Sequence, residues 1–295
     1  MGIYIVNKPL GKTSFDAVAM ARKQLGTKSV GHTGTLDPLA TGVLVIATDS
    51  STKLVQFLTA HSKDYLAFIS LGASTPTLDS EGPILETQAV PEFSSQQIKS
   101  VLSKFVGTQQ QLPPIYSAIH VNGERAYDLA RAGKEVKLEL RAVTIHRLEF
   151  LDYGANLDAV RQNHENLPTP LGESPTMLVF ASVSSGTYLR SLARDVGEAL
   201  GVPAHLSGLI RTRVGKFKLE DAVELENLHD AKPIFDLDAL EMPVIEVTPK
   251  QAKDARDGKK LEHNHTGQAV LTLSHQLVAV VEGDGSRLKV VRAWQ

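Results

Sequence analysis

The 295-residue chain has no cysteine. Disulfide bonds, thiolate nucleophiles and cysteine-bound zinc are therefore excluded. The sequence also lacks an apolar run long enough to span a bilayer, and its N-terminus lacks the basic segment, apolar stretch and cleavage site of a secretory signal. We expect a cytoplasmic protein without a membrane partner. His263 and His265 alternate in a loop without the further ligands of a zinc site, so no metal is expected.

Charge of one sign is not in excess either, because 31 Lys and Arg residues face 33 Asp and Glu residues. A net charge near zero argues weakly against a nucleic-acid partner, but the distribution of charge matters more. Residues 211–218 and 250–260 are both rich in basic side chains. The first of these stretches carries Arg211, Arg213, Lys216 and Lys218 and no acid. A neutral average can therefore hide a basic face, or these can simply be solvated charges.

Strand and helix patterns alternate irregularly along the chain, and hairpin-like pairs are common. We expect strands at 2–9, 43–47, 64–72, 113–123, 136–153, 176–186 and 207–219, and helices at 13–26, 52–58, 94–107, 125–133 and 187–201. This order favours an α+β fold with a mixed, mostly antiparallel central sheet flanked by helices. Residues 154–176 are predicted to form a long inserted loop. Residues 244–295 predict a small β-rich domain that follows a larger domain at 1–243.

The first helix has clear signals at both ends. Thr13 or Ser14 is predicted to cap its start, and Gly26 is predicted to end it. One face of this helix would carry Phe15, Val18, Arg22 and Leu25.

Asp37 lies in the stretch GHTGTLDPLATGVLVIATD, between a run of Gly and Thr and a strand that looks buried. Pro38 fixes its own φ and restricts Asp37 to extended conformations. Gly34 and Gly42 allow tight turns and the close approach of another backbone. Such a loop would hold a carboxylate at a fixed angle. From spacing alone, a simple turn role is the slightly better interpretation, because Asp often precedes Pro in turns.

A second candidate site lies in SSGTYLRSLARD, residues 184–195. Thr187 is predicted to cap a helix, which places Tyr188 and Arg190 in its first turn. A cation there opposes the helix dipole, and a carboxylate such as that of Asp37 would offset this cost and stay ionised. The alternative is an exposed Arg190, or one paired with another acid at the surface.

Two further side chains are ambiguous. Tyr65 opens a strand after a polar loop, where aromatic residues usually belong to the core. His32 lies in a glycine-flanked loop and is expected to be exposed, where it could stack on a base or simply be solvated.

Together these segments resemble the TruB family, the bacterial tRNA pseudouridine-55 synthases. GHTGTLDPLATGVL resembles the central motif of the family nearly letter for letter, and NKPLGKTSFDAV resembles its N-terminal Lys-Pro segment. DYLAFISLG, LPPIYSAIHVNGERAYDLARAG and SSGTYLRSLARDVGEALG resemble three further segments of the family. The resemblance covers about 3–240, and the tail resembles, more loosely, the small RNA-binding PUA domain that ends many members.

The resemblance implies an isomerase that acts on a uridine in the T loop of tRNA, without a cofactor or metal. Asp37 would be the nucleophile, and the sequence leaves open whether it attacks C1′, adds to C6 or lets a proton leave C2′. Arg190 would orient Asp37. Tyr65 would stack on the uracil and could help to remove the C5 proton, and Leu209 would pack beside the base.

The resemblance also implies contacts with the RNA. His32 would fill the gap that the target nucleotide leaves when it flips out of the loop. Further RNA contacts are expected from Lys8, Tyr188, Arg211, Arg213 and Lys216. Nothing in the sequence suggests more than a monomer.

The chain departs from the family pattern at two places. His120 stands where the family usually has Lys, and the insertion at 154–176 has no role that we can assign. Three other functions remain possible at this point: a relative guided by a separate RNA, a tRNA-binding folding helper whose catalysis is incidental, and a phosphatase-like hydrolase. The first usually has basic tails that this chain lacks, the second would not need Asp37, and the third needs an Asp before Gly-Thr that is missing here.

Overall fold

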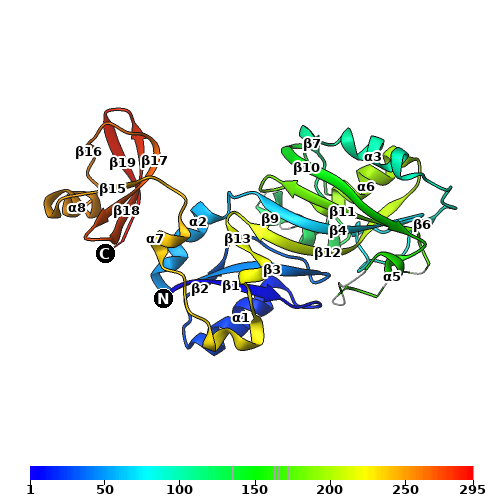
Figure 1. Cartoon of the computed structure of the whole chain (residues 1–295), viewed down its shortest axis with the longest axis horizontal. Helices are drawn as coiled ribbons and strands as arrows, with labels where there is room; N and C mark the ends of the chain where they lie inside the picture. Colours follow the sequence, from blue (N-terminus) through cyan, green and yellow to red (C-terminus); the bar gives the residue numbers. More distant parts are fainter. Residues whose placement is uncertain are drawn as a thin grey trace.

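The computed structural model describes residues 1–117, 119–121, 123–134, 136–161, 164, 167–169, 171 and 173–294. A large sheet with helices packed on it forms most of the molecule, and a smaller sheet lies at the C-terminal end (Figure 1). The N-terminus of the chain lies close to α7 (Asp236–Ala239), which precedes the smaller sheet in the chain (Figure 1). Among the described residues, no helix is both long enough and apolar enough to cross a membrane.

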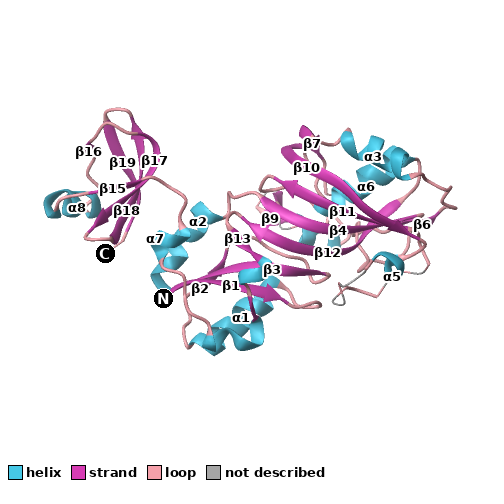
Figure 2. Ribbon diagram, viewed as in Figure 1, coloured by secondary structure: helices cyan, strands magenta, loops and turns pink. Residues whose placement is uncertain are grey.

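The large sheet is mixed and mostly antiparallel (Figure 2). Its strands follow the order β14 (Val223–Glu224), β1 (Gly2–Lys8), β3 (Ala40–Thr48), β12 (Ala204–Val214), β4 (Lys63–Leu71), β11 (Thr176–Val183), β10 (Arg141–Gly154) and β7 (Gly107–Gln111), with β2 (Val30–His32) paired to β3 and β13 (Phe217–Lys218) paired to β12. Among the described strands of this sheet, only the β1–β14 and β3–β12 pairs are parallel. The predicted α+β class is therefore confirmed.

The helices are α1 (Ser14–Leu25), α2 (Val55–Leu58), α3 (Ser95–Ser103), α4 (Ala126–Arg131), α5 (Leu157–Val160), α6 (Leu189–Leu200), α7 (Asp236–Ala239) and α8 (Pro249–Arg256), and 3-10 turns span Asp49–Leu54, Leu219–Asp221 and Leu225–Asp230. Two short hairpins pair β5 (Ala73–Ser74) with β6 (Glu86–Thr87) and β8 (His120–Val121) with β9 (Glu124–Arg125). Thr13 caps α1 in a capping box, and Gly26 ends it at φ +65°, as the sequence predicts.

Strand β3 is buried along its whole length. Leu44 and Ile46 pack with α1 on one face of the sheet, whereas Val43, Val45 and Ala47 pack with β1 and α2 on the other. An alternating strand with two covered faces must be apolar throughout, which explains its continuous apolar sequence. Because β3 begins at Ala40, this core fixes the end of the loop that carries Asp37.

The small sheet has the order β15 (Val244–Glu246), β17 (Thr266–Leu273), β18 (Gln276–Asp284), β19 (Arg287–Ala293) and β16 (Leu261–Glu262), with α8 packed on it. These strands are the β-rich C-terminal region that the sequence predicts. The small sheet is not isolated, because Val270, Val280 and Trp294 share one apolar cluster with Ile3 and Val45 of the large sheet.

Several local predictions are wrong. Of the described residues within 113–123, only His120–Val121 form a strand, since Pro113 and Pro114 cannot donate ladder hydrogen bonds. Residues 136–140 are not in a strand. The region 154–176 is not one loop, because β10 extends to Gly154 and the side chain of Asn156 caps α5; residues 162, 163, 165, 166, 170 and 172 of it lie outside the described residues.

The buried face of α1 also differs from the prediction. It consists of the small or branched residues Ser14, Ala17, Val18 and Ala21. Phe15 and Arg22, which were expected on one face with Val18, are exposed instead. Met20 and Leu25 pack partly buried beside this face, so the spacing of apolar residues alone did not identify which residues of α1 the sheet covers.

Candidate active site

Hydrogen bonds on both sides of Asp37 connect its loop to α1 and to the segment just before that helix. The Gly11 N–H donates to the Pro38 carbonyl at 2.9 Å. The buried Ser14 hydroxyl accepts from the Leu36 N–H at 2.8 Å and donates to the Leu36 carbonyl at 3.1 Å. The Ala40 N–H closes a tight turn by donating to the Asp37 carbonyl at 3.0 Å. Asp37 therefore lies on a rigid loop, as its Gly and Pro neighbours predict.

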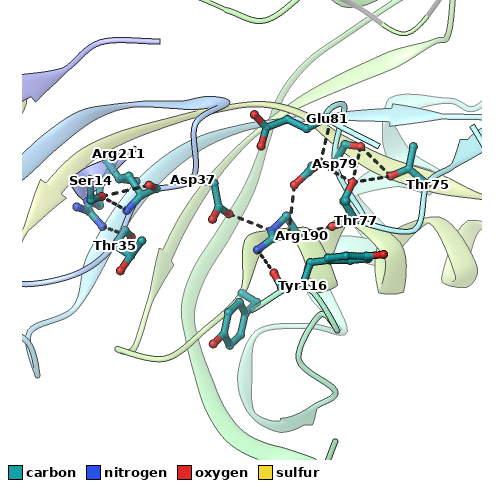
Figure 3. Close-up of polar contacts among 12 residues, drawn as sticks. Ser14, Thr35, Asp37, Thr75, Thr77, Asp79, Glu81, Tyr116, Arg190 and Arg211 are labelled. Carbon is teal, nitrogen blue, oxygen red and sulfur yellow. Dashed lines mark hydrogen bonds and ion pairs between the residues drawn. The ribbon is translucent and has the colours of Figure 1, made fainter. Parts of the chain in front are cut away.

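Arg211 stabilises the same loop through hydrogen bonds to its backbone. It is only 1% exposed, and its guanidinium donates to the carbonyls of Gly34, Thr35 and Val43 at 2.7–3.3 Å. Figure 3 shows Arg211 beside Thr35. The strand of Arg211 also explains Gly42, at φ +101°, because a Cβ there would lie 2.3 Å from the Arg211 carbonyl oxygen. The structure thus does not support the expected phosphate contact of Arg211, since its donors are already used to shape the loop.

Arg190 forms an ion pair with Asp37, with 3.0 Å between Nε and Oδ2 (Figure 3). Its guanidinium also pairs with Asp79 at 3.3 Å and donates to the Thr77 and Tyr116 carbonyls at 3.0 and 2.9 Å. The Arg190 side chain is 8% exposed and that of Asp37 is 36% exposed. A planar guanidinium with this many partners has a fixed orientation, so one oxygen of a solvent-accessible carboxylate is held in place.

Helix α6 begins one residue later than predicted. Tyr188, not Thr187, is its N-cap, so Tyr188 lies outside the helix while Arg190 is in the first turn. The Tyr188 side chain makes no capping bond. Instead the Gln111 side chain accepts from the Tyr188 N–H at 2.9 Å and donates to the Tyr188 carbonyl at 3.1 Å. Strand β7 therefore positions the start of the helix that carries Arg190.

Two acids that the sequence did not single out complete this cluster. Asp79 is 2% exposed and accepts from the Thr77 hydroxyl and the Glu81 N–H at 2.6 and 3.0 Å. Burial raises the pKa of the Asp79 carboxyl, an effect that Thr77 and Arg190 partly oppose. Partial burial, together with Asp79 and Asp37, raises the pKa of Glu81 to about 7. Arg190 therefore stands among three carboxyl groups (Figure 3).

The raised pKa of Glu81 predicts a pH-dependent stability. The folded protein holds a proton on Glu81 up to about pH 7, whereas the unfolded chain loses it near pH 4.5. The free energy of unfolding therefore loses a contribution as the pH rises through this interval, and the cost of the charged carboxylate is fully present above it. Glu81→Gln should raise the melting temperature relative to wild type by more at pH 8 than at pH 4.5.

Glu86→Gln on the exposed strand β6 removes the same formal charge outside this cluster and serves as the control. Thermal unfolding of the three proteins at both pH values measures the difference. An equal effect of Glu81→Gln at the two pH values would show that Glu81 does not titrate in this way.

Tyr65 and Leu209 belong to one buried cluster with Leu36 and Leu189, the immediate chain neighbours of Asp37 and Arg190. Strand pairing places Tyr65 opposite Arg211, and Leu209 opposite Ala40. Both side chains are 6% exposed. Tyr65 therefore belongs to the core, as aromatic residues at such positions usually do, and it also lies near the Asp37 loop. Both are possible because this part of the core borders the site.

His32 is half-buried rather than exposed. Its Nδ1 accepts from the Gly34 N–H at 3.2 Å. Burial and the charge of Arg211 lower its pKa, so the imidazole is neutral at pH 7 with its proton on Nε2. The centroid of its ring lies 6.1 Å from that of Phe15, with the two planes at 89°.

The remaining candidate cations differ in accessibility. Lys8 is fully buried and donates to the carbonyls of Pro9 and Lys12, and burial lowers its pKa to about 8. A phosphate contact of Lys8 is therefore not supported. Arg213 binds both oxygens of Asp64, at 2.6 and 2.9 Å, and Lys216 is exposed and donates to the Asp238 carbonyl. In the stretch 211–218, Arg211 and Arg213 thus bind groups of the protein itself, whereas Lys216 and Lys218 are exposed.

The two departures from the family pattern, His120 and the insertion at 154–176, fall partly outside the described residues. Nothing is described of the His120 side chain. Part of the insertion at 154–176 also lies outside the described residues, although α5 packs Leu157 and Val160 against Phe68 of β4. Among the residues that the structure describes, no group of three or more His, Asp or Glu could hold a metal ion.

The arrangement can present one oriented carboxylate to a substrate. Nε of Arg190 pairs with Oδ2 of Asp37, and the Asp37 side chain is 36% exposed, so the carboxylate remains accessible to a substrate. The carboxylate can therefore act as a nucleophile or a base while its orientation is fixed by the guanidinium.

Known proteins match the chain over its whole length. The family model "TruB family pseudouridylate synthase (N terminal domain)" matches residues 22–189, and "tRNA pseudouridylate synthase B C-terminal domain" matches residues 190–244. The tRNA pseudouridine synthase B of Deinococcus radiodurans is 54% identical, with 100% of each chain covered. That of Thermus thermophilus is 45% identical, over 100% of this chain and 99% of the relative. A solved Cbf5-Nop10-Gar1 complex contains a chain with a TM-score of 0.71 and 25% identity, with coverage of 100% of this chain and 84% of that one.

Proposed function

Because the chain belongs to the TruB family of pseudouridylate synthases, we propose that it isomerises uridine 55 in the T loop of tRNA through the carboxylate of Asp37. The observation that carries this proposal is the 3.0 Å ion pair between Arg190 and a partly exposed Asp37. The reaction breaks the bond from C1′ to N1 and forms one from C1′ to C5. The C5 hydrogen leaves as a proton and N1 gains one, so atoms and electrons balance without a cofactor.

The proposed site needs the uridine to leave its stack in the loop. Asp37 lies on a short loop above buried strands, and an enzyme cannot reach the ribose and base atoms of a stacked nucleotide from there. In the proposed complex the flipped uracil stacks on Tyr65 and packs beside Leu209, and His32 takes the place that it left. A neutral imidazole suits stacking among bases.

The small sheet is the proposed PUA-like RNA-binding unit. Its helix α8 and the turn after it carry Lys250, Lys253, Arg256, Lys259 and Lys260, all exposed. Phosphate contacts by such side chains make affinity fall steeply with salt concentration. We propose a monomeric enzyme, since the ion pair of Asp37 and Arg190 forms without a second subunit. A tRNA substrate implies action in the cytoplasm.

The experiment that tests this proposal maps pseudouridine along an unmodified tRNA transcript after incubation with the protein. We expect one pseudouridine, at position 55, and none in a transcript in which uridine 55 is replaced by cytidine. A T stem-loop alone should also be modified. Pseudouridine at another position, or modification only in the presence of a separate guide RNA, would contradict the assigned target.

A further inference from the structure

Phe15 is a large aromatic residue that the core of the protein does not use. Its side chain is 66% exposed, although it lies in the first turn of α1, beside the buried Ser14. The buried face of α1 consists of smaller residues. An isolated exposed apolar residue needs no explanation by itself, but the surroundings of Phe15 give it a possible contact surface.

The position of Phe15 is fixed relative to Asp37. Ser14, its neighbour in the chain, bonds both the N–H and the carbonyl of Leu36. Gly11 bonds Pro38 on the other side of Asp37. The capping box of Thr13 and Asp16 holds the first turn of α1 in place. Phe15 therefore belongs to the same rigid unit as the reacting loop.

The ring of Phe15 meets that of His32 nearly at a right angle, at 6.1 Å between centroids. In an edge-to-face pair each ring keeps at least one face that its partner does not cover, and Phe15 is mostly open to solvent. Two rings at such an angle form an aromatic corner. Bases that are splayed out of an RNA loop stack on faces of this kind.

We propose that Phe15 is a second RNA-stacking residue beside His32, and that its ring packs on an unpaired base of the target loop next to the flipped nucleotide. This inference rests on the proposed function, since it needs an RNA loop at the site. Lys12, exposed in the same segment, can contact the backbone of that loop.

The test compares Phe15→Ala, Phe15→Leu and Phe15→Tyr in the full-length protein on an unmodified tRNA transcript. Stacking on an aromatic ring contributes enough that its removal should raise KM about 10-fold or more, while kcat changes by less than about twofold because the reacting carboxylate is untouched. Phe15→Tyr should keep the wild-type KM, and Phe15→Leu should not. The melting temperature of each variant should equal that of wild type, because the side chain is exposed.

Phe235→Ala is the matched control, since it removes another exposed Phe, at the N-cap of α7. It should leave KM unchanged. A wild-type KM in Phe15→Ala, or full activity in Phe15→Leu, would overturn the inference. Turnover of the wild-type protein on the same transcript tests the proposed function separately. An inactive wild-type protein would contradict the proposed function, whereas an active wild-type protein whose KM does not change on substitution of Phe15 would contradict only the inference about Phe15.

A double-mutant cycle with His32→Ala separates direct contact from an effect through His32. If Phe15 itself contacts RNA, Phe15→Ala should still raise KM in the His32→Ala background. If its only role is to orient His32, that increase should disappear, and the proposed contact with RNA would be wrong.

Discussion

Asp37→Asn is expected to lower the single-turnover rate of pseudouridine formation at least about 10⁴-fold. The carboxamide has nearly the shape of the carboxylate, and the backbone bonds that fix its loop do not involve the side chain. What it lacks is the negative charge that a nucleophile or base needs at this position. Release of tritium from C5-labelled uridine in tRNA measures the rate.

The affinity of Asp37→Asn for tRNA should stay within about fivefold of wild type, because contacts with phosphates dominate RNA binding. Asp158→Asn, at an exposed position of α5, is the matched control and should keep wild-type turnover. If Asp37→Asn fails to bind tRNA, Asp37 has a structural role. If it retains turnover, the reacting group is a different one.

Arg190→Met should have the second largest effect, through two separable causes. Loss of the guanidinium frees Asp37 to rotate, and a small displacement of a reacting group costs about 100-fold in turnover. The same change leaves the buried Asp79 without its cation, which should lower the free energy of unfolding by about 3–5 kcal/mol. Single-turnover kinetics and denaturant unfolding measure the two effects.

The double variant Arg190→Met/Asp79→Asn separates these causes. Neutralising Asp79 should recover part of the stability, whereas turnover should stay low because Asp37 still lacks its partner. Recovery of turnover together with stability would show that Arg190 acts only by supporting the fold. Arg190→Lys should also remain slow, since an ammonium cannot make the four contacts of the guanidinium.

Local signals made the contact between Asp37 and Arg190 one alternative among several, since spacing alone slightly favoured a turn role for Asp37 and left Arg190 with other possible partners. The family resemblance was needed to favour it. Pro38 and the glycines restrict the loop of Asp37, and a cation in the first turn of a helix needs an acid. Strand β3 was predicted from its continuous apolar sequence. Such a feature can be predicted because the residues that determine it lie within the feature itself or a few residues from it.

The remaining features of the site depend on contacts between distant segments. Arg211 was expected to bind phosphate, but the strand that carries it passes under the loop at 34–43, so it binds backbone carbonyls. Asp79 lies 42 residues from Asp37 in a polar loop, and nothing in its local sequence indicates that β12 and α6 bring it to Arg190. Phe15 was predicted to share a face of the first helix with Val18, but only the packed structure shows that the Phe15 side chain is exposed.

The most direct test of the account is the structure of the Asp37→Asn protein bound to an unmodified T stem-loop. We predict that uridine 55 lies outside the stack of the loop, with its base on Tyr65 and its C1′ or C6 within about 3.5 Å of the side chain of residue 37. Arg190 should still contact that side chain. A uridine 55 that remains stacked in the loop, or that binds away from residue 37, would contradict the account.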